Sequence, residues 1–147
     1  MTDPVTQSNV PAKLATYPLP ARKMLDQIRN WVFDLAAGMK DVGDLDESLK
    51  WGEPAWRPKS GSGTTIRADW KSKTPDQVMI FFDCKTDLID RTRSLLSDQL
   101  TCEGNRAIIL PIDHPMPEGA IKTALGWALR YHIDRTIAPK QPQITTP

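Results

Sequence analysis

The spacing of the apolar residues changes several times along this chain, and these changes limit the folds that it can adopt. From Ala21 to Ala37 the apolar side chains recur at helical intervals, between Pro20 at the start and Gly38 at the end. The apolar positions are Met24, Leu25, Ile28, Trp31, Val32 and Leu35. The pattern predicts one long amphipathic helix with a single buried face.

Strand-like segments follow this helix. Residues 48–51 and 55–56 read as two short extended pieces around a turn at residues 52–54, and residues 64–70 alternate between apolar and polar side chains. Residues 78–82 are apolar on both faces, as in a central strand. Helical spacing returns in residues 87–96 and 117–133, separated by a strand at residues 106–110, and the second of these helices carries His132 on its apolar stripe. This order predicts an α+β fold with two layers, in which helices cover one face of a mainly antiparallel sheet.

The proline-rich ends of the chain differ from its middle. The first twenty residues contain Pro4, Pro11, Pro18 and Pro20 among polar residues, and three more prolines follow residue 134. We therefore expect a flexible N-terminal arm at 1–20, one domain at 21–133 and a flexible C-terminal tail at 134–147. A chain of 147 residues is the size of a single domain and needs no disulfide or metal to fold.

The charge balance and the lengths of the apolar runs argue against two classes of partner, nucleic acids and membranes. The 19 basic and 18 acidic residues give a net charge of +1, whereas binding through nucleic-acid phosphates calls for a basic excess. No apolar run is long enough to span a bilayer, and the first twenty residues lack the apolar core of a signal peptide. The two cysteines do not form a C-x-x-C motif. We expect a reduced, cytoplasmic protein that binds neither nucleic acid nor membranes.

A set of polar and aromatic residues forms the first candidate site. Its members are Trp51, Glu53, Trp56, Arg67, Asn105, Arg106, Tyr131 and His132. A charged side chain among aromatic residues needs a partner, because burying an unpaired ion is costly. Pairing of Glu53 with Arg67 or Arg106 would leave a cleft walled by tryptophan, suited to a small anionic ligand or a partner peptide. The alternative is a structural ion pair, with the tryptophans in the core.

An acidic run after the first helix is the second candidate. It consists of Asp41, Asp44, Asp46 and Glu47. Hard cations take oxygen ligands, although the spacing is not that of a calcium loop, and a solvated loop is the alternative. The soft ligands Cys84, Cys102, His114 and His132 match no zinc spacing.

Three segments together resemble the YdhG-like family of small uncharacterised bacterial domains. They are residues 47–56 (ESLKWGEPAW), residues 61–67 (GSGTTIR), and residues 103–109 (EGNRAII) with the helix end at 128–132 (ALRYH). The similarity runs from about Leu14 to His132. It implies a two-layer α+β fold likened to secretion chaperones and frataxin. One member is described as a frataxin-like intracellular iron chaperone, which implies iron as a weakly held cofactor on the acidic run. The family has no established catalytic residues to carry over.

These observations favour a non-enzymatic binding or chaperone-like domain that takes a small ligand or a protein partner. Weak iron handling is one alternative, and an enzyme with Glu53 or His132 as acid or base is another. No nucleophile elbow and no phosphate loop of the Walker type occur in the sequence. The oligomeric state stays open.

Overall fold

A computed structural model of the chain describes residues 9–137 and contains one six-stranded antiparallel sheet. Its strands are β1 (Leu45–Lys50), β2 (Glu53–Pro58), β3 (Ile66–Asp69), β4 (Gln77–Phe82), β5 (Thr101–Glu103) and β6 (Ala107–Pro111). They lie in the order β1-β2-β3-β4-β6-β5, and each strand is antiparallel to its neighbours. The order follows the chain except at the β5–β6 hairpin, which reverses the last two strands.

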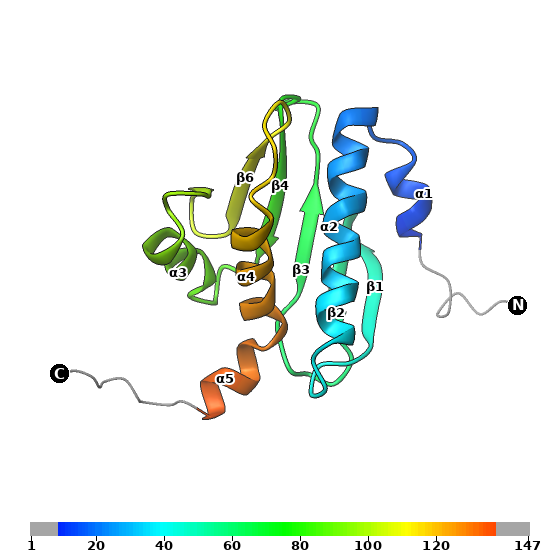
Figure 1. Ribbon diagram of the computed structural model, residues 1–147. Helices are drawn as coiled ribbons and strands as arrows, with labels where there is room; N and C mark the ends of the chain where they lie inside the picture. The colour runs from blue at the N-terminus through cyan, green and yellow to red at the C-terminus, as the bar shows by residue number, and fades with distance from the viewer. Residues whose placement is uncertain (1–8, 138–147) are drawn as a thin grey trace, which may run out of the picture.

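The helices form the second layer. They are α1 (Val10–Leu14), α2 (Leu19–Ala37), α3 (Leu88–Leu95), α4 (Glu118–Leu129) and α5 (Tyr131–Ile137). Helices α2 and α4 pack against each other over one face of the sheet, while α3 lies beside β5 and α1 beside β1 and β2 (Figure 1). The predicted two-layer α+β fold is therefore confirmed. None of the helices within residues 9–137 has the length and apolar character needed to cross a lipid bilayer.

The main core lies between the sheet and the α2–α4 layer. Alternate residues of each strand enter it, because successive side chains of a strand point to opposite faces. Strand β3 contributes Ile66 and Ala68, and β4 contributes Val78, Ile80 and Phe82, all of them almost inaccessible to solvent. The predicted central strand at 78–82 is confirmed, and the predicted helix at 21–37 corresponds to α2.

The N-terminal boundary differs from the prediction of an arm up to residue 20. Residues 10–14 form α1, α2 begins at Leu19, and Val10, Leu14 and Tyr17 are buried in the main core. Three apolar side chains among prolines suffice to dock a short helix, since Pro11 occupies its first turn, where no backbone donor is required. Residues 1–8 and 138–147 of the predicted arms lie outside the described part of the chain.

The C-terminal helix also differs from the prediction of one helix over 117–133. Helix α4 ends at Leu129, Arg130 leaves the helical conformation with φ of −111°, and α5 follows. The new axis turns His132 out of the apolar stripe that continuous helical spacing predicted, and His132 is exposed. The short edge strand β5 was not predicted at all.

The β2–β3 loop meets the end of α4. The backbone N–H of Thr64 donates to the carbonyl of Ala128 at 2.9 Å, and the Ser62 hydroxyl donates to that of Leu129 at 2.9 Å. These bonds satisfy carbonyls that a helix end leaves without an intrahelical donor. Gly63 sits so close to this helix end that a Cβ added to it would collide with main-chain atoms of Ala128 and Leu129.

Candidate functional site

The sheet face opposite the helices carries a group of charged side chains, two of which are buried carboxylates. Side chains of Arg67 and Asp69 on β3 alternate with the core residues of that strand, so they point to this open face. Beside them lies a small apolar cluster separate from the main core, formed by Met79, Phe81 and Ala107 with Ile109 packed against it. Arg67 and Lys71 lie over the Phe81 ring of this cluster, and they belong to a network of five charged or phenolic side chains.

The network holds two buried carboxylates. Glu53 and Asp69 are only 7% and 6% exposed, and the Lys71 ammonium donates to both, at 2.9 and 3.0 Å. Arg67 donates to the other oxygen of Glu53 at 3.0 Å, and the Tyr17 hydroxyl donates to Asp69. Each buried charge thus has a partner of opposite sign, which is the condition under which proteins bury ions.

The network changes the acidity of two of its members. Burial, and then the hydrogen bond to Asp69, raise the pKa of the Tyr17 phenol well above its ordinary value. For Lys71, burial acts to lower the pKa, but the hydrogen bonds and charges of Glu53 and Asp69 outweigh it and the pKa rises. Both groups therefore hold their protons more tightly in the folded protein than in the unfolded chain.

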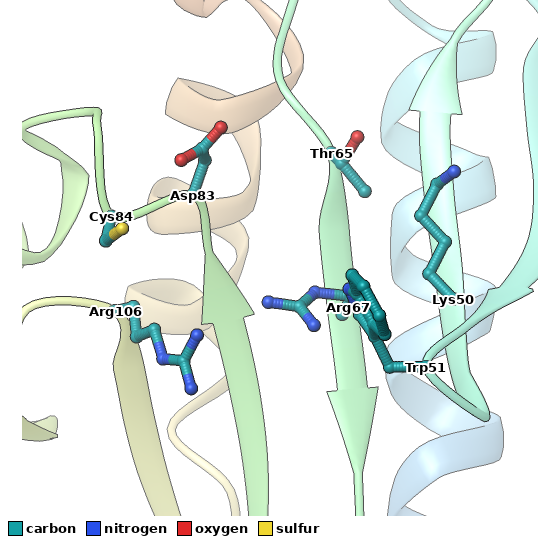
Figure 2. Close-up of a pocket in the computed structure, with 7 residues that line it drawn as sticks. All are labelled: Lys50, Trp51, Thr65, Arg67, Asp83, Cys84 and Arg106. Carbon is teal, nitrogen blue, oxygen red and sulfur yellow. The ribbon is translucent and has the colours of Figure 1, made fainter.

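A pocket of about 240 Å³ opens next to this network, on the same face of the sheet. We call it the basic pocket; it is lined by Lys50, Trp51, Thr65, Arg67, Asp83, Cys84 and Arg106. These residues come from the β1–β2 turn, the start of β3, the end of β4 and the turn before β6 (Figure 2). The side chains of Arg67 and Arg106 extend toward each other across β4 in this view.

The pocket has more positive than negative charge. It gathers three cations, Lys50, Arg67 and Arg106, and one carboxylate, Asp83. Arg67 is already bound to Glu53. Within residues 9–137, Lys50 and Arg106 make no ion pair, so two positive charges remain uncompensated by protein groups. Such a surface attracts anions.

Trp51 forms one wall of the pocket in an unusual backbone conformation. In the backbone register of the β1–β2 hairpin, Lys50 lies opposite Glu53. Trp51 and Gly52 therefore make a two-residue turn, with φ of +57° and +78°. Hairpin turns with positive φ at both positions favour Asn-Gly, because Asn and Gly tolerate this conformation whereas most other residues are strained in it. The Trp51 side chain is also 89% exposed. The turn therefore holds a large aromatic ring in solvent at a local conformational cost.

The structure brings together only some of the residues that the sequence proposed for the first site. Trp51, Arg67 and Arg106 line the basic pocket, and Glu53 adjoins it through Arg67. Asn105 lies in the exposed turn before Arg106 and does not line the pocket. The predicted pairing of Glu53 occurs with Arg67.

Three further members of that set lie elsewhere. Trp56 is fully buried on the helix-covered face, where its indole N–H donates to Glu47 at 2.8 Å. Tyr131 and His132 contact each other edge-to-face at the start of α5, and the backbone N–H of His132 donates to Ser62. The structure therefore assigns Trp56 to the core and sets this histidine apart from the basic pocket.

The acidic run is dispersed over several arginine partners. Arg130 binds Asp41, Arg57 binds Asp46 at 3.1 Å, and Arg29 binds Glu47 through two nitrogens. Asp46 and Glu47 are adjacent on β1 and so face opposite sides of the sheet. Among the described residues no group of three or more histidine, cysteine or acidic side chains is placed to hold a metal ion. Iron binding on Asp41, Asp44, Asp46 and Glu47 stays a prediction.

Sequence reasoning missed several residues of this region. Lys50, Thr65, Asp83 and Cys84 line the pocket, and Tyr17, Asp69 and Lys71 complete the network. One signal was present: Asp69 and Lys71 extend the polar side of the alternating strand that carries Arg67. Asp83 and Cys84 gave no signal, because they join the site only through the pairing of β4 with β3 and β6.

Comparison with known proteins supports the fold. No protein-family model matches the chain, and no curated protein matches it. A crystal structure of a DUF1801-family protein from Bacillus subtilis, YdhG, is similar to it with a TM-score of 0.62. The match covers 88% of this chain and 92% of that one, at 12% sequence identity. The likeness shows the fold. The resemblance drawn from the sequence motifs points to the same family of structures, and function must be argued from the site.

Proposed function

We propose that this protein binds a small organic anion in the basic pocket. The observation that carries the proposal is Trp51, an exposed aromatic ring held in a left-handed turn beside Lys50 and Arg106, which have no ionic partner in the described part of the chain. A strained backbone conformation persists only where the surrounding structure holds it, and such conformations cluster at active sites and ligand-binding sites. An indole face offers an apolar and π-bonded surface to the carbon skeleton of a ligand.

The arginines supply the recognition of the anion. Guanidinium groups form paired hydrogen bonds with carboxylate or phosphate, and Arg106 has all its donors available to such a group within the described structure. Arg67 donates a hydrogen bond to Glu53 at 3.0 Å, and the centre of the Phe81 ring lies 5.4 Å from the guanidinium carbon of Arg67. Arg67 is therefore oriented before a ligand arrives, which reduces the entropy lost on binding.

The size of the pocket sets the size of the ligand. Its volume of about 240 Å³ is below the range of roughly 300–1,000 Å³ that is common for drug-sized ligands. A small metabolite fits this space better than a nucleotide or an extended peptide does. The size of the pocket therefore favours a small molecule as the ligand.

A titration with simple anions tests the proposal. Phosphate, benzoate and glutarate are added to the full chain, and binding is followed by shifts of backbone amide NMR signals near Trp51 and Arg106. We expect at least one carboxylate to bind, and Arg106→Ala to weaken that binding by tenfold or more, as loss of a charge-assisted bidentate contact does. Because Arg106 is exposed and its side chain has no partner among residues 9–137, the melting temperature should change by no more than 1–2 °C, about the effect of a surface substitution.

Arg22→Ala is the matched control. Arg22 lies on the outer side of α2 in a solvent-exposed pair with Asp26, far in sequence from the pocket residues. This variant should bind as the wild-type protein does. The proposal fails if none of the three anions binds, or if Arg106→Ala and Arg22→Ala affect binding equally.

A further inference from the structure

The charges of the basic pocket are separated in space, and this separation narrows the class of ligand. Asp83 and Thr65 lie at one end of the pocket, whereas Arg67, Arg106 and Trp51 lie at the other (Figure 2). Lys50 borders the side formed by the hairpin. A simple anion would use the arginine end and leave the Asp83 end without a partner.

Asp83 retains the capacity to bind a donor. One of its oxygens accepts the backbone N–H of Lys85 at 2.9 Å, and within residues 9–137 the carboxylate makes no ion pair. An ionised carboxylate has about four acceptor positions, so this single bond leaves most of them open. The Thr65 hydroxyl beside it adds a group that both donates and accepts.

A count of the unpaired charges gives the charge pattern of the ligand. Among the described residues, Arg67 is matched by Glu53, which leaves Lys50 and Arg106 as two positive charges and Asp83 as one negative charge. The complementary ligand carries two negative groups and one positive group. Its positive group must lie at the Asp83 end, and its negative groups within reach of Arg106 and Lys50.

We infer that the ligand is a small dicarboxylic amino acid. One carboxylate binds Arg106 together with the free side of Arg67, the ammonium binds Asp83 and Thr65, and the second carboxylate lies at Lys50. The methylene chain lies against the Trp51 ring. This inference rests on the proposed anion-binding function, and it adds the ammonium group and the second carboxylate to that proposal. A molecule of this class is small enough for a pocket of about 240 Å³.

Three probes of nearly equal size separate the contributions. Glutamate carries both carboxylates and the ammonium, glutarate lacks the ammonium, and glutamine replaces one carboxylate with a neutral amide. We expect glutamate to bind with the lowest Kd. Each of the other two should bind about two- to fivefold more weakly, the change given by loss of one solvent-exposed ion pair.

Asp83→Asn tests the assignment of the ammonium. Asparagine keeps an acceptor for the N–H of Lys85, so the turn is retained while the negative charge is removed. In this variant glutamate should lose its preference over glutarate. Asp98→Asn is the matched control, because Asp98 is exposed and does not line the pocket; there the preference should be unchanged.

The outcomes separate this inference from the proposed function. If glutarate binds as tightly as glutamate to the wild-type protein, or if the preference survives in Asp83→Asn, the inference is overturned while anion binding stands. The same holds if none of the three probes binds but benzoate or phosphate does. If no anion of either set binds, both proposals fall. A glutamate preference that disappears only in Asp83→Asn supports the inference.

Discussion

The two faces of the sheet use the same kinds of residue in different ways. Trp56 and Trp51 are five positions apart along one hairpin, yet the first is fully buried under the helices and the second is 89% exposed on the hairpin turn. The side chains of Glu47 and Glu53 are both buried and paired, but they lie on opposite faces of the sheet. Glu47 binds Arg29 from α2 and the Trp56 indole on the covered face, whereas Glu53 binds Arg67 and Lys71 on the open face.

This comparison distinguishes polar groups that stabilise the fold from charged groups that remain available to bind a ligand. On the covered face the polar groups of Arg29, Glu47 and Trp56 bind one another and fix α2 to the hairpin. On the open face a comparable network stops at Arg67, and the next cations, Lys50 and Arg106, have no ionic partner within residues 9–137. Residue type alone does not distinguish these roles. What distinguishes them is whether each charge is already matched.

The two tryptophans give the largest expected difference. Trp56→Ala removes a fully buried aromatic side chain and should lower the free energy of unfolding by about 3–5 kcal/mol. Trp51→Asn replaces a strained residue with one that suits the turn, and should raise that free energy by up to about 1 kcal/mol while weakening anion binding. Urea denaturation of both variants measures the effects. A loss of more than about 1 kcal/mol in Trp51→Asn would show that the indole stabilises the fold, contrary to the comparison.

Two acidic residues on the hairpin give an intermediate difference. Glu53→Gln leaves Arg67 and Lys71 with a neutral partner in a buried position and should cost about 1–3 kcal/mol. Asp46→Asn breaks a pair with Arg57 in which both side chains are about half exposed, and should cost between about 0 and 1 kcal/mol. Thermal denaturation at neutral pH compares them. Equal losses in the two variants would contradict the assignment of Glu53 to a buried network.

The smallest expected effect is a pH dependence of stability. The pKa of Tyr17 is raised in the folded protein, so the phenol contributes stability that is complete below its ordinary pKa of about 10 and is lost as the pH rises above it. Lys71 has a raised pKa and acts in the same direction. Between pH 9 and 11, Tyr17→Phe should therefore lose less stability than the wild-type protein does. Parallel stability curves for the two proteins over this range would refute the contribution of Tyr17.

The helix and sheet layers of this fold could be predicted because the pattern of apolar residues in a long segment shows which of its faces are buried. The residues of α2 follow the helical period without interruption, residues 78–82 of β4 form a continuous apolar run, and both elements lie where these patterns indicated. The short elements α1 and β5 were missed, since five and three residues are too few to establish a period. His132 was misplaced because the break at Arg130 involves neither glycine nor proline.

Only those residues of the candidate site that lie close together in the sequence could be predicted to belong to one site. Trp51, Glu53 and Arg67 lie on one hairpin and its neighbouring strand, and the sequence suggested their association. Asp83 and Tyr17 join the site through tertiary packing of segments distant along the chain, and neither has a local signature. The sequence also could not show which tryptophan of the hairpin is buried, because Trp51 leaves the alternation at the turn.

The contact at Gly63 fixes the axial position of the last long helix. Its main chain lies against the end of α4, and the neighbouring Thr64 and Ser62 bind the carbonyls of Ala128 and Leu129 there. A shift of α4 by one turn, about 5.4 Å along its axis, would place different carbonyls opposite these donors and would lose both bonds. One residue without a side chain thus sets the register between helix and sheet, much as a hairpin turn sets the register between two strands.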